Sequence, residues 1–197
     1  MILGLAKKDN AFRRGFKTKA EQLAKEYRLL LGIHPCEGLC AFELAKHLNI
    51  SVIPATELID EKEFEKELKG IDGKSSEWSA LTIKTKAENQ IIIHNPFNSV
   101  VRQQSDIMHE LAHIICKHER NQKEYPFPIP FGMHGYDELQ EEEAKFLGGA
   151  LQISTPCLLW ARKNKASVES IAMKYNASVE MARYRMNITG IFRLKKN

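Results

Sequence analysis

Hydrophobic residues recur at helical spacing along most of the chain. From Phe12 to Leu30 they return every three or four positions, which predicts a helix ending near Gly32. The range 39–48 shows the same period and predicts a second helix. Apolar positions also recur at helical spacing over 99–120, without a glycine or proline, and predict a largely buried helix about five turns long.

The spacing changes in the middle of the chain. Residues 51–53 form a short β-rich run, and two more runs, 78–85 and 90–94, are joined by a short connection that predicts a hairpin. The range 56–69 is acidic and amphipathic and predicts an exposed helix. With a further helix predicted over 137–152, the chain is expected to be α+β, mostly helical with a small sheet.

The helix over 99–120 contains an H-E-x-x-H motif, formed by His109, Glu110 and His113. Residues four apart lie on the same face of a helix, so the two imidazoles can bind one metal ion. Neutral histidine suits Zn²⁺, and the intervening Glu110 can act as the general base on a metal-activated water. The alternative is a pair of core histidines with ordinary hydrogen bonds, but that would bury Glu110 without a purpose.

A catalytic zinc site needs a third protein ligand and an open position. The first turns of the helix over 137–152 carry Glu138, Glu141, Glu142 and Glu143. Acidic residues at a helix N-terminus complement the helix dipole, which accounts for two or three of the four. One of them can face the histidines, but the residues alone do not decide which one.

Two stretches of the chain resemble the ImmA/IrrE metallopeptidases. The first is the sequence from His109 to His113, and the second is Glu-Glu-Glu-Ala-Lys-Phe-Leu-Gly-Gly-Ala-Leu from Glu141 onwards. That family has a ligand glutamate three residues before a helical alanine, and matching this alanine to Ala144 implies Glu141 as the third zinc ligand. Lys145 departs from the family, which often has Asn or Asp there. The resemblance extends from about residue 20 to residue 190 and implies a zincin-like core.

The resemblance also implies an activity and a partner. It indicates a gluzincin-like zinc endopeptidase that cleaves a helix-turn-helix repressor of a mobile element, phage or stress regulon and so relieves repression. It further implies that the substrate lies extended against a sheet edge in front of the motif helix. On this alignment we expect Glu142 and Glu143 to be replaceable with little effect.

Two other classes of function stay open. One is a non-catalytic DNA- or protein-binding regulator with a structural metal site, which a fourth protein ligand would favour. The other is an interaction protein without catalysis.

The segment between the two ligand helices has candidate residues of its own. Its range 125–131 alternates large apolar residues with prolines, so it either covers the core or lines the substrate cleft. His134 and Tyr136 follow, and either can stabilise the oxyanion of a tetrahedral intermediate.

Composition fits a small globular protein. The chain has 197 residues, 43% of them hydrophobic, enough for one domain with a core or one domain plus a small appendage. No apolar run is long enough to cross a membrane, and the first ten residues have too short an apolar stretch for a signal peptide. Four cysteines are few for a secreted disulfide framework, so we expect a cytoplasmic protein without a membrane partner.

Positive charge is concentrated at the C-terminal end. After Pro156 there are nine lysines and arginines against two acids, a net +7, which leaves −3 of the overall +4 for the rest. Ser167 and Ser178 are candidate N-caps of two short helices, the second over 179–187, and the pair resembles a helix-turn-helix. The match is imperfect, because Arg185 stands at a usually apolar position and the turn has no glycine.

We therefore expect a metallopeptidase domain over 1–156 and a basic helical tail over 157–197 that packs on it. Nucleic-acid binding by this tail is expected to be weak and salt-dependent. The alternative is two packing helices with a solvated basic face.

Overall fold

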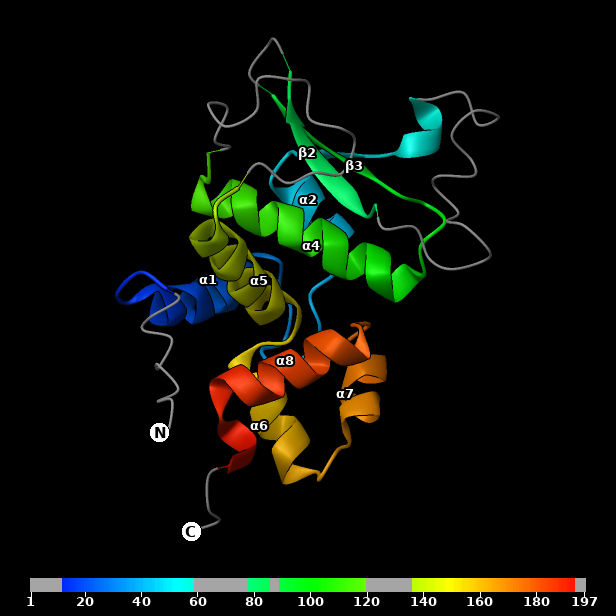
Figure 1. Ribbon diagram of the computed structural model, residues 1–197. Helices are drawn as coiled ribbons and strands as arrows, with labels where there is room; N and C mark the ends of the chain where they lie inside the picture. Colours follow the sequence, from blue (N-terminus) through cyan, green and yellow to red (C-terminus); the bar gives the residue numbers. More distant parts are fainter. Residues whose placement is uncertain (1–11, 59–77, 86–88, 120–135, 194–197) are drawn as a thin grey trace, which may run out of the picture.

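The structure is a computed structural model that describes residues 12–58, 78–85, 89–119 and 136–193 (Figure 1). Most of the helix expected over 56–69 lies outside the described residues, as do the proline-containing segment 125–131 and His134. The start of that range forms a short 3-10 helix instead, η1 (Ala55–Glu57).

The described elements confirm a mostly helical α+β fold. In chain order they are α1 (Phe16–Leu30), α2 (Ala41–His47), β1 (Ser51–Pro54), β2 (Ala80–Lys84), β3 (Gln90–His94), α4 (Val100–Cys116), α5 (Glu138–Gln152), α6 (Thr155–Lys163), α7 (Val168–Lys174), α8 (Val179–Thr189) and η3 (Ile191–Arg193). None of the described helices is long and apolar enough to cross a membrane.

The sheet has the strand order β1-β3-β2, with β3 at its centre. β2 and β3 pair antiparallel, which confirms the predicted hairpin, while β1 runs parallel to β3. The N–H of Asn95 donates to the carbonyl of Ser79, and that of Thr85 donates to the carbonyl of Asn89, both at 2.8 Å. Because antiparallel pairing alternates, the backbone groups of the even-numbered residues of β2 point away from β3, and those of Thr82 are among them.

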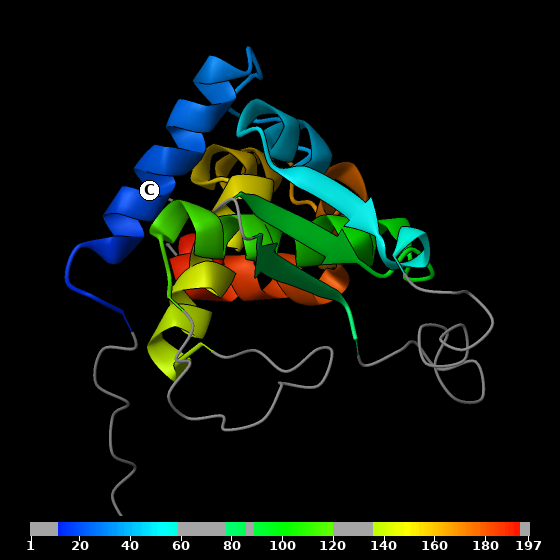
Figure 2. The ribbon, with the colours of Figure 1, turned by 90° about the horizontal axis from the view of Figure 1, so that it is seen from above.

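Helix α4 lies at the centre of the fold. The sheet covers one side of it, and α1 and α5 lie on the other (Figures 1 and 2). Its buried residues Ile107, Met108 and Leu111 join the main core. At Gly148 of α5 a Cβ atom would lie 3.2 Å from the carbonyl oxygen of Met108, so the glycine allows the two helices to approach closely.

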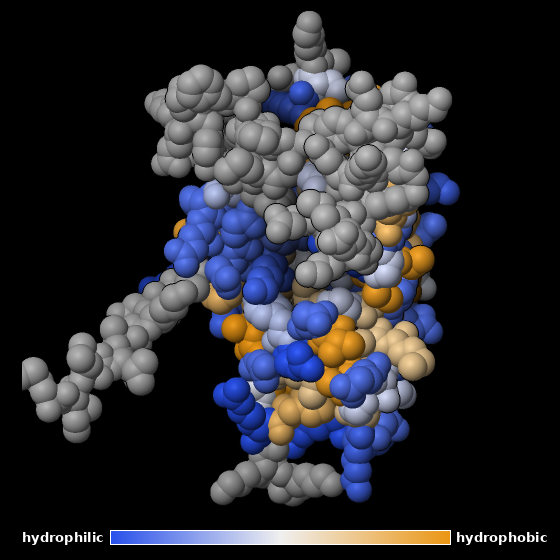
Figure 3. Space-filling model, turned by 45° about the vertical axis from the view of Figure 1, so that its right-hand side comes forward, coloured by the Kyte–Doolittle hydropathy of each residue, from blue (hydrophilic) through white to orange (hydrophobic). Residues whose placement is uncertain are grey.

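Helices α6, α7 and α8 enclose a second buried cluster, which includes Ile153, Leu158, Ile171, Tyr175 and Ala182. The division of the chain into 1–156 and 157–197 stays a prediction, since Ile153 belongs to this cluster as well. On the face shown in Figure 3, this part of the molecule presents hydrophilic and hydrophobic side chains interleaved.

Local signals explain where the C-terminal helices begin. The predicted caps are confirmed: the hydroxyls of Ser167 and Ser178 accept hydrogen bonds from the backbone N–H groups of Ser170 and Met181. Between α7 and α8, Asn176 adopts a φ of 47°. Asparagine tolerates this left-handed conformation better than most residues, so it serves where a turn glycine is usual.

Candidate metal centre

Helix α4 carries the H-E-x-x-H motif, as the sequence predicted. The hydroxyl of Ser99 caps its first turn by accepting from the N–H of Arg102. The helix ends at Cys116, earlier than the expected residue 120, because Lys117 turns into the left-handed region with a φ of 55°. The rings of His109 and His113 lie on one face, with centroids 4.7 Å apart.

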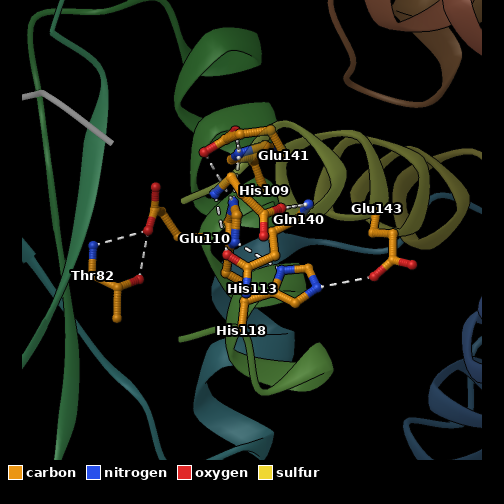
Figure 4. A network of polar contacts seen from close by, with 9 residues as sticks. Thr82, His109, Glu110, His113, His118, Gln140, Glu141 and Glu143 are labelled. Carbon is orange, nitrogen blue, oxygen red and sulfur yellow. Dashed lines mark hydrogen bonds and ion pairs between the residues drawn. The ribbon is translucent and has the colours of Figure 1, made fainter. Parts of the chain in front are cut away.

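Helix α5 brings Glu141 to these histidines. Asp137 begins the helix with a capping box: its carboxylate accepts from the N–H of Gln140 at 2.8 Å, and the Gln140 side chain accepts from the N–H of Asp137. Glu141, in the first turn, then points toward α4 (Figure 4). Its Oε2 lies 3.1 Å from Nε2 of His109, and its Oε1 lies 3.8 Å from Nε2 of His113.

These three side chains fit a bound zinc ion. The two Nε2 atoms of His109 and His113 are 3.0 Å apart, and each lies 3.1 or 3.8 Å from a different oxygen of Glu141. One ligand atom from each side chain lies within 4.8 Å of the other two. Ligands at ~2.0–2.1 Å from a tetrahedral zinc ion lie roughly 3.3 Å from one another. Oε1 of Glu141 is buried and has no hydrogen-bond partner in the described part of the structure, so a metal ion would satisfy it. No fourth His, Cys, Asp or Glu of the described part joins the group.

The protonation states also suit a metal. Burial lowers the pKa of His113, which favours the neutral imidazole that a metal binds. Burial raises the pKa of Glu141, but its polar interactions with His109 and His113 outweigh this effect and hold that pKa well below its usual range. The site therefore presents an anionic carboxylate beside a neutral imidazole.

Glu110 points away from these three side chains, toward the sheet (Figure 4). It is buried, and its Oε2 accepts two hydrogen bonds from Thr82, at 2.9 Å from the backbone N–H and 2.6 Å from the hydroxyl. Sequence reasoning missed Thr82. Its place in a short β-rich run gives no sign of which way its backbone N–H points.

Two further residues lie behind His113: His118, which the sequence analysis missed, and Glu143, which it expected to be replaceable. Nδ1 of His118 lies 2.9 Å from Nδ1 of His113, and Nε2 of His118 lies 3.3 Å from Oε2 of Glu143. The side chains of His118 and Glu143 are each 1% exposed. Glu143 therefore differs from the replaceable surface carboxylate that the family alignment led us to expect.

Tyr136 packs directly on the site. Its ring stacks on that of His113, with centroids 3.8 Å apart and an interplanar angle of 14°. A role for Tyr136 at the oxyanion stays a prediction.

Comparison with known proteins identifies the family. A family model described as the IrrE N-terminal-like domain, a peptidase family, matches residues 59–187, about two thirds of the chain. No curated protein and no solved structure gave a significant match. The matched region includes the H-E-x-x-H motif and Glu141, in agreement with the resemblance found in the sequence. The chain thus belongs to the IrrE N-terminal-like family of metallopeptidases.

Proposed function

We propose that the protein is a zinc-dependent endopeptidase in which His109, His113 and Glu141 hold the ion and Glu110 is the general base. The observation that carries this proposal is the convergence of three ligand side chains from α4 and α5, which offer one ligand atom each within 4.8 Å of the other two. Two histidines and a glutamate are a ligand set of catalytic zinc sites, which leave one position open. When bound, zinc polarises the substrate carbonyl and activates a water for attack on it.

Glu110 has the surroundings that a general base needs. It follows His109 directly on α4, and two hydrogen bonds from Thr82 fix its carboxylate in one orientation. In that orientation the carboxylate can accept a proton from the attacking water. Glu110 then delivers this proton to the leaving amine as the peptide bond breaks.

The adjacent sheet edge suits an extended substrate. In the described part of the chain β2 pairs with β3 alone, so the outward edge of β2, where Lys84 is exposed, can pair with a peptide strand. The outward N–H of Thr82 is already bonded to Glu110. A peptide bound there would lie beside the proposed general base.

Within this class of protein substrates, we propose a helix-turn-helix transcriptional repressor of a mobile element, phage or stress regulon. Two observations support this substrate: the family membership and the ImmA/IrrE-like sequence around Glu141. Such a repressor acts in the cytoplasm, the compartment that the cysteine usage favours.

The decisive experiment incubates the zinc-loaded protein with the repressor encoded beside its gene and identifies the products by mass spectrometry. Glu110→Gln should keep about one zinc per chain yet abolish cleavage, because the base is not a ligand. His113→Ala should lose the metal, and Glu141→Ala should lower zinc affinity strongly. Glu142→Ala, one residue further along α5, is the matched control and should bind zinc like the wild type. Undiminished proteolysis by Glu110→Gln would exclude the mechanism.

The competing function is a non-catalytic regulator with a structural metal site. Structural zinc sites usually close with four protein ligands, whereas the group found in the described residues has three. A crystal structure of the zinc-bound protein that shows four protein ligands on the ion would favour this alternative.

A further inference from the structure

A chain of three buried polar side chains leads away from the metal centre behind His113. His113 contacts His118 through its Nδ1 atom, and His118 contacts Glu143 through its Nε2 atom (Figure 4). The backbone N–H of Arg13 donates to Oε1 of Glu143 at 3.2 Å. The side chains of His113, His118 and Glu143 are 0–1% exposed. Burying a carboxylate and two imidazoles costs free energy unless each one is hydrogen-bonded. We therefore expect these contacts to hold the three side chains in this one arrangement.

The end of α4 explains how His118 reaches His113. Lys117 adopts the left-handed conformation, and the N–H of His118 donates to the carbonyl of His113 at 3.0 Å. This six-residue closure is a Schellman motif, which folds the residue after the left-handed one back over the last turn. The helix terminus itself thus places the His118 ring against the His113 ring.

The distances allow one consistent placement of the ring protons. His113 directs Nε2 toward His109 and Glu141, and a nitrogen that binds metal carries no proton. Its proton is then on Nδ1, which donates to Nδ1 of His118. The proton of His118 must consequently be on Nε2, which donates to the carboxylate of Glu143. Each of the two contacts then has one donor and one acceptor. The chain of hydrogen bonds ends at Glu143, whose ionised carboxylate can only accept.

We propose that His118 and Glu143 are positioning residues that fix the metal-binding tautomer and the ring orientation of His113. The inference rests on the proposed metal site. Metal-bound histidines commonly donate their other ring N–H to a carboxylate, which raises the basicity of the ligand. Here a second imidazole stands between the ligand and the carboxylate. Helix α5 then has two tasks: Glu141 reaches the metal site, and Glu143 reaches His118.

Zinc affinity tests the proposal without using peptidase activity. The full chain is stripped of metal, and zinc binding is measured by competition with a chelator for the wild type, Glu143→Gln and His118→Gln. Loss of such a partner typically costs 10–100-fold in metal affinity, and we expect a loss in that range for both variants. Glu142→Gln, which removes the neighbouring carboxylate of α5, should leave affinity unchanged. Circular dichroism melting of the metal-free proteins separates this effect from unfolding.

Histidine nitrogen NMR of the zinc-loaded wild type provides a measurement that does not depend on a variant folding. We expect His113 to carry its proton on Nδ1 and His118 to carry its proton on Nε2. A proton on Nδ1 of His118, or unchanged zinc affinity in both folded variants, would overturn the inference and leave the proposed function intact. A wild-type chain that binds no zinc would overturn both. Zinc binding without repressor cleavage counts against the proposed function alone.

Discussion

Arg185 of α8 donates a hydrogen bond to the carboxylate of Glu21 in α1, although 164 positions separate the two residues. Arg185 is completely buried, and its Nε also donates to the carbonyl of Ile153 at 3.0 Å. Its guanidinium lies over the ring of Phe146, 5.1 Å from the centroid. The arginine that made the helix-turn-helix match imperfect therefore ties the C-terminal helices to the metallopeptidase core.

This ion pair yields the first prediction. Arg185→Met keeps an unbranched side chain but removes the donor to Oε1 of Glu21 and to the Ile153 carbonyl. We expect a loss of about 3 kcal/mol of unfolding free energy, the lower end of the range for breaking a buried pair, because Glu21 keeps partial access to water. Urea unfolding of the full chain measures it. Arg183→Met, on the exposed face of the same helix, should change little, and equal midpoints for Arg185→Met and the wild type would contradict the prediction.

The second prediction concerns the general base. Thr82→Val preserves the shape of the side chain and removes the hydroxyl that donates to Glu110 at 2.6 Å. A hydrogen bond to a charged group contributes about 1.5–3 kcal/mol, so repressor cleavage should slow roughly tenfold or more. Zinc content should stay at the wild-type level, since Thr82 contacts none of the proposed ligands. Thr82→Ser retains the hydroxyl and serves as the control; a valine variant as fast as wild type would show that the bond is not needed.

The third prediction is a pH dependence of stability. Burial raises the pKa of Asp106 to about 6, although Arg102, at 3.6 Å, opposes this effect. The folded protein therefore binds this proton more tightly than the unfolded chain. The resulting stabilisation is complete below pH ~4 and is lost as pH rises through about 6.

Asp106→Asn should remove this dependence. In the metal-free protein the variant should gain stability relative to wild type as pH rises from 4 to 7.5, by on the order of 1 kcal/mol. Denaturant unfolding at several pH values measures the difference. A difference that stays constant across this range would show that Asp106 is not the group responsible.

The helices and the two motif histidines were predictable because their signals are local. Apolar residues at helical spacing identify α4, and residues four apart on a helix share a face whatever surrounds them. The same holds for Ser167 and Ser178, whose capping bonds reach only three residues ahead. Glu141 was predictable only in part. The residues alone left four glutamates as candidates for the third ligand, and the resemblance to a family selected Glu141.

The remaining contacts depend on how distant segments meet. Thr82 reaches Glu110 through the strand register of β2 and its position beside α4, neither of which the local sequence reveals. His118 reaches His113 because Lys117 adopts a left-handed conformation. A glycine would have indicated such a turn in the sequence, and a lysine does not. The partner of Arg185 lies at the other end of the chain, so its burial was not readable from the helix that contains it.

The last prediction concerns the basic tail and nucleic acid. Ala182 and Arg185 of α8 are buried, so the solvent-facing part of this helix offers Glu180, Arg183 and Asn187. One arginine beside a glutamate is a poor basis for reading bases in the major groove. The exposed basic residues outside α8 are spread over the other C-terminal segments. One of them, Lys174, lies over the Trp160 ring, 4.4 Å from its centroid.

We therefore expect weak DNA binding without sequence preference. Fluorescence anisotropy with two unrelated duplexes should give equal dissociation constants of about 10⁻⁴–10⁻⁶ M at physiological salt, as for nonspecific binding. Affinity should fall steeply between about 50 and 200 mM salt, because a few phosphate contacts release counterions. Arg183→Glu should weaken binding to both duplexes equally. A nanomolar footprint on one sequence, lost in Arg183→Glu, would contradict this expectation and favour the DNA-binding regulator over the peptidase.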